Sequence, residues 1–171
     1  TAISSITKTA VTGGYKCTCK PASALKDGSH TISVTATDND GNTSAAKTST
    51  FTVDTVPPTL SITAPAEGLV TNKKTVTVTG KTDDATSKPV TVTVNGSAAT
   101  VGTDGSFSKD VTLTEGANKI TIIATDKAGK TTTVVRNVTL DTAAPVIKSI
   151  TITPNPVDCG KTFIISVEIT D

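Results

Sequence analysis

Aliphatic residues and threonines alternate along most of this chain. The alternation is clearest in Thr75-Val-Thr-Val-Thr79, Thr91-Val-Thr-Val94 and Ile150-Thr-Ile-Thr153. Because successive side chains of a β-strand point to opposite faces, a period of two places the aliphatic residues on one face and the hydroxyls on the other. The pattern predicts strands with one buried and one solvent-exposed face, and long amphipathic helices are absent from it.

The middle of the chain, about Pro58 to Asp141, contains several such segments separated by turn signals. Asn95-Gly96 is a strong hairpin signal, and Asp104-Gly105 and Glu115-Gly116 mark two more turns. The predicted strands are Leu60–Thr63, Thr75–Gly80, Val90–Val94, Ser106–Leu113, Lys119–Thr125 and Thr132–Leu140. Six or seven short antiparallel strands with frequent turns predict an all-β sandwich rather than a parallel sheet.

Part of this middle segment occurs twice in the chain. The block Gly28–Gly41 corresponds to Gly116–Gly129, and each copy runs into a Val/Leu-Asp-Thr-x-x-Pro linker. The two linker aspartates, Asp54 and Asp141, are 87 residues apart (141 − 54). This period suits a small β-sandwich of roughly 100 residues and is too long for a solenoid repeat.

Alignment of the copies divides the chain into three pieces. Residues 57–142 form a complete module, residues 1–56 match the C-terminal part of such a module, and residues 143–171 match its N-terminal strands. In the first piece Tyr15 takes the place of Phe107. The last piece supplies the strands that the first piece lacks.

A half sandwich would leave an apolar face and open strand edges in water, so the terminal pieces require an explanation. In one, the chain is a piece of a longer array, which its start at Thr1 without Met also indicates. In the other, Ile150–Thr153 and Phe163–Ile169 of one copy complete the first piece of a neighbouring copy, giving a head-to-tail polymer.

Composition limits the classes of partner. The 171 residues carry a net charge of +1, with 18% charged and 2% aromatic residues and no tryptophan. A nucleic-acid partner is not expected, because there is no basic patch and no set of stacking aromatics. No membrane partner is expected either, since no apolar run reaches the length of a transmembrane helix.

The reactive side chains do not form a catalytic pattern. His30 is the only histidine, and we expect it in an exposed loop. Asp83 and Asp84 are expected to be solvated in a loop. Cys17 and Cys19 should point to one face of a strand and are poorly placed to bridge each other, while a link from Cys159 to either stays open. We therefore expect a protein that is not an enzyme.

The segment Thr35–Thr43, its near copy Ile123–Thr131, and the linkers that follow resemble the repeat signature of bacterial immunoglobulin-like domains. Such domains are found in surface adhesins, in accessory regions of secreted glycosidases and in bacteriophage tail and capsid proteins. The stretch Ser149–Phe163 resembles the opening of modules in Gram-positive surface and phage structural proteins, with Pro154 and Pro156 making an edge strand and a turn.

The resemblance implies tandem immunoglobulin-like modules acting as a semi-rigid spacer, display or adhesion segment. Its expected location is extracellular, on a bacterial or virion surface, and its partners are neighbouring modules of the same or an adjacent chain. The alternative is an accessory module of a secreted enzyme that binds glycan or protein, for instance on a host surface. The scarcity of aromatics counts against glycan binding, because sugars usually stack on aromatic rings.

Some adhesins of this kind bind calcium between modules through loop and linker aspartates. The resemblance therefore makes calcium a candidate ligand of Asp38, Asp54, Asp126 and Asp141. The alternative is that these aspartates only shape turns by accepting hydrogen bonds from backbone N–H groups. The short proline-bearing linkers Asp54–Pro58 and Asp141–Pro145 predict a restricted angle between modules.

Overall fold

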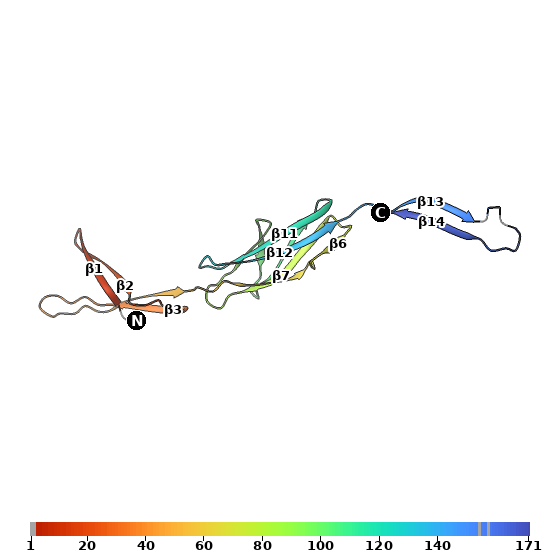
Figure 1. Cartoon of the computed structure of the whole chain (residues 1–171). Coiled ribbons are helices and arrows are strands. Elements are labelled where there is room, and N and C mark those ends of the chain that lie inside the picture. The colour runs from red at the N-terminus through yellow and green to blue at the C-terminus, as the bar shows by residue number, and fades with distance from the viewer. Residues whose placement is uncertain (1–2, 154, 157) are drawn as a thin grey trace.

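The computed structural model is all-β and describes residues 3–153, 155–156 and 158–171 (Figure 1). None of the described segments forms a helix long and apolar enough to cross a membrane. Eight strands build the centre of the molecule, and three hairpins of two strands each build its two ends. The position expected for Pro154 in an edge strand lies outside the described residues.

The central module is the predicted β-sandwich. Its strands are β5 (Thr59–Ala64), β6 (Leu69–Thr71), β7 (Thr75–Asp83), β8 (Thr91–Val94), β9 (Ser97–Val101), β10 (Ser106–Thr112), β11 (Gly116–Thr125) and β12 (Thr131–Leu140). They follow the order β5-β7-β10-β9-β8-β11-β12-β6 in one sheet that curls on itself, so that β5 also contacts β12.

Two strands of this module differ from the sequence prediction. The prediction omitted β9 and β6, which are short segments of five and three residues. It also expected antiparallel pairing only, whereas β6 runs parallel to β12. Strand β6 lies at the edge of the sheet beside β12, and its Leu69 packs against the core.

The core consists of aliphatic side chains from the inward-facing positions of the alternating pattern. Val78, Ile120, Ile122 and Ala124 have no exposed surface, and Phe107 is the one aromatic side chain among the buried residues described. Leu113, which directly follows β10, and Leu140, the last residue of β12, are also buried. The alternation of valine with threonine therefore separates core from surface as the sequence predicts.

The first piece forms two hairpins, in which β1 (Ile3–Val11) pairs with β2 (Gly14–Pro21) and β3 (Gly28–Val34) pairs with β4 (Lys47–Val53). The prediction that His30 lies in a loop is wrong. His30 lies in β3, and its ring stacks on Phe51 of β4 with 5.6 Å between centroids. This contact shields part of the His30 ring. Cys17 and Cys19 of β2 are exposed and have free thiols.

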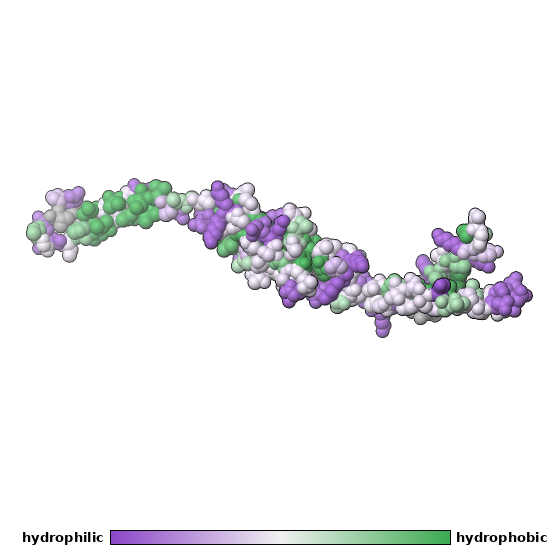
Figure 2. Space-filling view, turned by 180° about the vertical axis from the view of Figure 1, so that it is seen from behind, coloured by the Kyte–Doolittle hydropathy of each residue, from purple (hydrophilic) through white to green (hydrophobic). Residues whose placement is uncertain are grey.

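The last piece is a single hairpin of β13 (Val146–Thr153) and β14 (Ile164–Thr170). All residues of both strands are exposed, including the cross-strand pairs Ile150–Val167 and Ile152–Ile165. Figure 2 shows the resulting hydrophobic surface at this end of the molecule. Figure 1 places this hairpin and the first piece at opposite ends of the central module.

Candidate metal centre at the first linker

Three aspartates from distant parts of the sequence meet at the end of the central module that faces the first piece. Asp54 follows β4 in the linker, Asp84 follows β7, and Asp126 follows β11. One carboxylate oxygen from each lies within 4.8 Å of the others. The fold brings them together because β7 and β11 end at the same pole of the sandwich at which the linker enters.

Backbone amides hold each of these carboxylates by one oxygen. Asp84 Oδ1 accepts hydrogen bonds from the N–H groups of Thr86 and Ser87 at 2.8 and 2.7 Å. Asp126 Oδ1 accepts one from the Lys130 N–H at 2.9 Å, and Asp54 Oδ1 accepts one from the Val56 N–H at 3.1 Å. These are the turn-shaping bonds that short polar side chains make at loop ends.

The remaining oxygens distinguish this cluster from an ordinary set of turns. Asp84 is 6% exposed and Asp126 is 5% exposed. Oδ2 of Asp54 and Oδ2 of Asp126 are buried and have no hydrogen-bond partner. A buried charged acceptor without a partner is costly, and three carboxylates this close repel one another. The residues therefore fit a hard cation, which takes oxygen ligands from several loops.

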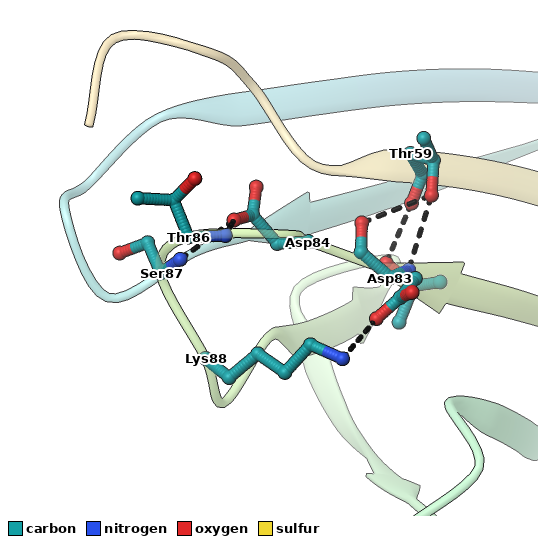
Figure 3. Close-up of polar contacts among 7 residues, drawn as sticks. Thr59, Asp83, Asp84, Thr86, Ser87 and Lys88 are labelled. Carbon is teal, nitrogen blue, oxygen red and sulfur yellow. Dashed lines mark hydrogen bonds and ion pairs between the residues drawn. The ribbon is translucent and has the colours of Figure 1, made fainter. Parts of the chain in front are cut away.

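The prediction that Asp83 and Asp84 are both solvated is wrong for Asp84. The two neighbours point to different surroundings, as Figure 3 shows. Asp83 is exposed and forms an ion pair with Lys88 at 2.7 Å, and the hydrogen bond from Lys88 lowers the pKa of Asp83. Asp84 turns toward the amides of Thr86 and Ser87 and is buried.

Two of the four aspartates predicted for calcium belong to this cluster, and two do not. Asp38 lies in the β3–β4 loop, where the Asn42 side chain and the amides of Asp40 and Asn42 occupy both its oxygens and lower its pKa. Asp141 lies in the second linker, where its Oδ1 accepts the Ala143 N–H at 3.0 Å. The structure therefore separates these two residues from Asp54 and Asp126.

Spacing along the chain was the available signal for Asp84, which the sequence prediction missed. Asp84 follows the first linker aspartate, Asp54, by 30 residues (84 − 54), and Asp171 follows the second, Asp141, by 30 residues (171 − 141). Asp84 comes directly after β7, and Asp171 comes directly after the corresponding strand β14. Asp84 and Asp171 are therefore separated by the same 87 residues (171 − 84) as the two linker aspartates.

At both linkers a threonine also donates hydrogen bonds to an acidic side chain of the preceding module. Thr55 Oγ1 donates to Asp27 Oδ2 at 2.9 Å. At the equivalent place Thr142 donates through its N–H and its hydroxyl to the two carboxylate oxygens of Glu115, at 3.0 and 2.8 Å. These bonds lower the pKa of Glu115. Each linker is thus tied back to the loop that precedes the next-to-last strand of its own module.

Two family matches and several similar proteins are found for this chain. Residues 58–142 match the family described as glucodextranase, domain B, and residues 2–55 match the bacterial Ig-like domain. Over 126 residues the chain is 39% identical to Bacillopeptidase F of Bacillus subtilis (strain 168). That alignment covers 74% of this chain and 9% of the relative, so the chain spans less than a tenth of that protein.

Similar solved structures are more distant. The fibronectin(III)-like modules of Clostridium thermocellum CbhA superpose with a TM-score of 0.43 and 20% identity, covering 75% of this chain and 69% of that one. A tetra-tandem repeat from the extending region of a large adhesion protein superposes with a TM-score of 0.42 and 20% identity, covering 95% and 54%.

Proposed function

We propose that this chain, which is built from bacterial immunoglobulin-like repeat domains, is a non-catalytic spacer that sets the distance and angle between other parts of a larger extracellular protein. The observation that carries the proposal is the repeated fixation of the linkers. A flexible tether would need neither the Asp27–Thr55 bond nor the Glu115–Thr142 pair. Because the same kind of hydrogen bond recurs at both linkers, we infer that the angle between consecutive modules is important for function.

The linker backbone supports the same role. Each linker begins with an aspartate that accepts the amide two residues later, Val56 in the first linker and Ala143 in the second. Each linker also contains proline, which restricts the backbone and extends it more than glycine or serine would. Short, bonded, proline-bearing linkers restrict bending between consecutive modules.

The relative bears on the kind of protein to which such a spacer belongs. Bacillopeptidase F is, by its name, a peptidase, and the region similar to this chain is a small part of it. We infer that the present modules are likewise an accessory segment of a bacterial surface or secreted protein. A bacterial relative favours this origin over a phage particle.

Glycan binding receives less support from the surface. The hollow beside Lys88 is lined by Thr82, Pro89 and Val90 together with residues of β9 and the β9–β10 turn, and no aromatic side chain lines it. A second hollow, between β7 and β10, includes Phe107, but this ring is buried and offers no exposed face. Flat sugar rings usually bind against aromatic faces. The spacer role is therefore preferred to that of a glycan-binding accessory module.

Small-angle X-ray scattering of the whole chain tests the spacer role. Replacing linker residues 142–145 by Gly-Ser-Gly-Ser should broaden the distribution of interatomic distances and shorten the mean end-to-end distance. The same replacement in the β3–β4 loop, at residues 39–42, is the control, because this loop joins no modules. Unchanged scattering after the linker replacement would show that the linker does not set the angle.

A specific observation favours a second candidate, a subunit that exchanges strands with its neighbours. The apolar residues of β13 and β14 are exposed, and so are Ile32 and Val34 of β3. By sequence alignment β13 and β14 correspond to β5 and β7, whereas β1–β4 correspond to β9–β12. A composite of the two ends from different copies would contain both layers of a sandwich and lack the counterparts of β8 and the short β6.

A further inference from the structure

We propose that Cys17 and Cys19 are sites of reversible thiol modification, and that their state controls strand exchange between copies of this chain. As free thiols they can be covered by β14 of a neighbouring copy, whereas a bulky mixed disulfide on these residues keeps that strand away. The proposal rests on the second candidate function, strand exchange, and is independent of the spacer role.

The two cysteines lie on the face of β2 that also carries Tyr15. The three residues alternate along the strand, so their side chains point to the same side. Lys8 of β1 is the register partner of Cys17, and its Nζ lies 3.9 Å from the centroid of the Tyr15 ring on this face. Both cysteines are exposed and have free thiols, so a reagent in solution can reach them.

The central module shows how the equivalent face of β10 is covered. The alignment puts Tyr15 in the place of Phe107, and the two cysteines then take the places of Lys109 and Val111. Phe107 is 4% exposed, and Lys109 and Val111 are half-buried. Strand β10 has β9 on one side and β7 on the other. In the described part of the chain β2 pairs with β1 alone, so the place of β7 beside it is open.

Strand β14 is the equivalent of β7 in the last piece. Asp171 directly follows β14, Asp84 directly follows β7, and these aspartates are one linker period apart. Ile165 therefore takes the place of Val78. Figure 1 places β14 and β2 at opposite ends of the molecule, so a β14 that covers β2 belongs to a second copy.

The register of the central module predicts which side chains meet in this contact. In the β7–β10 pair Val78 lies opposite the equivalent of Cys17. Ile165 of one copy should therefore lie opposite Cys17 of the next, and by the same correspondence Phe163 should lie opposite Cys19. Ile165 is 57% exposed and Phe163 is 51% exposed, so the contact would bury apolar surface.

One position of this contact departs from the central module. A Cβ at Gly80 would lie 2.8 Å from Cζ of the Phe107 ring, which packs closely on this glycine. Val167 takes the place of Gly80, so the Tyr15 ring has to lie to one side of β14. The contact with Lys8 of β1 places the ring on the side of the hairpin away from the open edge of β2.

The modification is thiol–disulfide exchange with a small disulfide such as glutathione disulfide. The cysteine thiolate attacks one sulfur and forms a new S–S bond, the old S–S bond breaks, and the second glutathione leaves as a thiolate that takes up the proton lost by the cysteine. A dithiol such as dithiothreitol reverses the reaction by the same exchange. A thiol is smaller than the lysine or valine at the equivalent positions, whereas an attached tripeptide leaves no room for a covering strand.

Sedimentation of the whole chain at increasing concentration tests the proposal. In dithiothreitol the mean mass should rise with concentration. After treatment with glutathione disulfide, with both adducts verified by mass spectrometry, the chain should stay monomeric, and dithiothreitol should restore the association. The variant with Cys17→Ser and Cys19→Ser should associate as the parent does and no longer respond to glutathione disulfide. Cys159→Ser, which removes the other exposed thiol, is the matched control and should respond as the parent does.

A disulfide trap tests the register. In a chain with Cys19→Ser and Cys159→Ser, Ile165→Cys should form a disulfide with Cys17 of another copy under the thiol oxidant diamide, because paired strands hold opposite residues within disulfide reach. Ile164→Cys, one position away on the other face of β14, is the control. Peptide mapping should find far less of its cross-link to Cys17.

The outcomes separate the thiol control from strand exchange itself. Association that persists when both cysteines carry glutathione would overturn the thiol control and leave strand exchange standing. A reduced chain that stays monomeric at every concentration would overturn both. Equal cross-linking of Cys17 to positions 164 and 165 would overturn the register. None of these results bears on the spacer role, which is measured separately by scattering.

Discussion

Aspartate performs different tasks in this chain, and the partner of its second oxygen decides which. Asp38 and Asp126 make the same kind of turn with their first oxygen. The second oxygen of Asp38 accepts the Asn42 amide, whereas that of Asp126 is buried and unpaired. Asp104 uses a single oxygen for both the N–H and the hydroxyl of Ser106. A turn signal in the sequence therefore does not reveal whether a ligand oxygen is left over.

Two turn glycines differ in what surrounds them, although their backbones are alike. Gly96 and Gly105 have φ angles of +78° and +80°. A Cβ at position 96 would meet no heavy atom within 4 Å, whereas at position 105 it would overlap the carbonyl oxygen of Thr82. The Thr82 N–H also donates to the Gly105 carbonyl at 2.9 Å, so the two segments cannot easily separate.

We therefore predict that Gly96→Ala lowers the free energy of unfolding by about 1 kcal/mol, from its left-handed backbone alone. Gly105→Ala should lower it by about 3 kcal/mol, because a steric overlap adds to the same backbone cost. Urea unfolding followed by far-ultraviolet circular dichroism measures both values. Equal losses in the two variants would show that the chain near Thr82 moves aside without cost.

At the scale of the elements, similar strands have different surroundings. β7 and β14 occupy equivalent places in the repeat and share an alternating pattern. Val78 of β7 is fully buried, whereas Val167 and Ile169 of β14 are about half exposed. Burial of β7 comes from its neighbours β5 and β10 and from the opposite layer, and β14 has β13 alone. The alternating pattern of a strand determines which of its faces can be buried, and the neighbouring strands determine whether that face is buried.

The hydrogen bonds that hold the second linker should depend on pH, because they involve the carboxylate of Glu115. Hydrogen bonds from Thr142 lower the pKa of Glu115, so the ionised carboxylate favours the docked linker. For a lowered carboxyl pKa, the stabilisation is complete above the value of the unfolded chain, about 4.3 for glutamate. It is lost as the pH falls through the lower value of the folded chain.

We predict that the amide signal of Thr142 is constant at neutral pH and shifts only as the pH falls below the ordinary pKa range of glutamate, because the pKa of Glu115 is lowered. Glu115→Gln should move this signal at neutral pH and remove its acid transition. Glu67→Gln is the control, because the pKa of Glu67 is lowered by Asn137 and not by the linker. If the amide signal of Thr142 instead changes with the pKa of an unperturbed glutamate, the linker is not docked onto Glu115.

At the scale of the whole molecule, the chain is unevenly folded. The central module encloses a core, and the hairpins at the two ends expose their apolar residues. Hairpins without further partners are marginally stable in water. Clusters of exposed apolar residues, such as Ile150, Ile152 and Val167 on the last hairpin, also favour association. The behaviour of the chain in solution therefore depends on what covers the ends.

Sedimentation at increasing concentration tests whether a second copy covers them. Under strand exchange the mean mass should rise with concentration, and Ile150→Lys with Val167→Lys should keep the chain monomeric. The control changes the cross-strand pair Thr151 and Ser166 to lysine on the other face of the same hairpin. A parent chain that stays monomeric at the highest concentration contradicts strand exchange.

Local chemistry along the chain was sufficient for the strands, the turns and the repeat. A strand face needs only alternation, and a turn such as Asn95-Gly96 needs only its own residues, so the all-β sandwich was predictable. Strand β6 was missed because it has only three residues, and β9 was missed because Ser97-Ala-Ala-Thr-Val101 lacks the alternation of large aliphatic residues with threonine. The family resemblance implied Asp38, Asp54, Asp126 and Asp141 as candidate calcium ligands, and local sequence does not distinguish these four residues from one another.

Other features depend on segments far apart in the sequence. Asp84 joins Asp54 and Asp126 only because β7 and β11 end beside the incoming linker, and nothing local distinguishes it from the exposed Asp83. Asp38 and Asp141 have the same local motifs as Asp126 and Asp54 and lie outside this cluster. Burial and convergence are properties of packed layers, so they emerge only when the sandwich closes, whereas strand and turn preferences act between neighbouring residues.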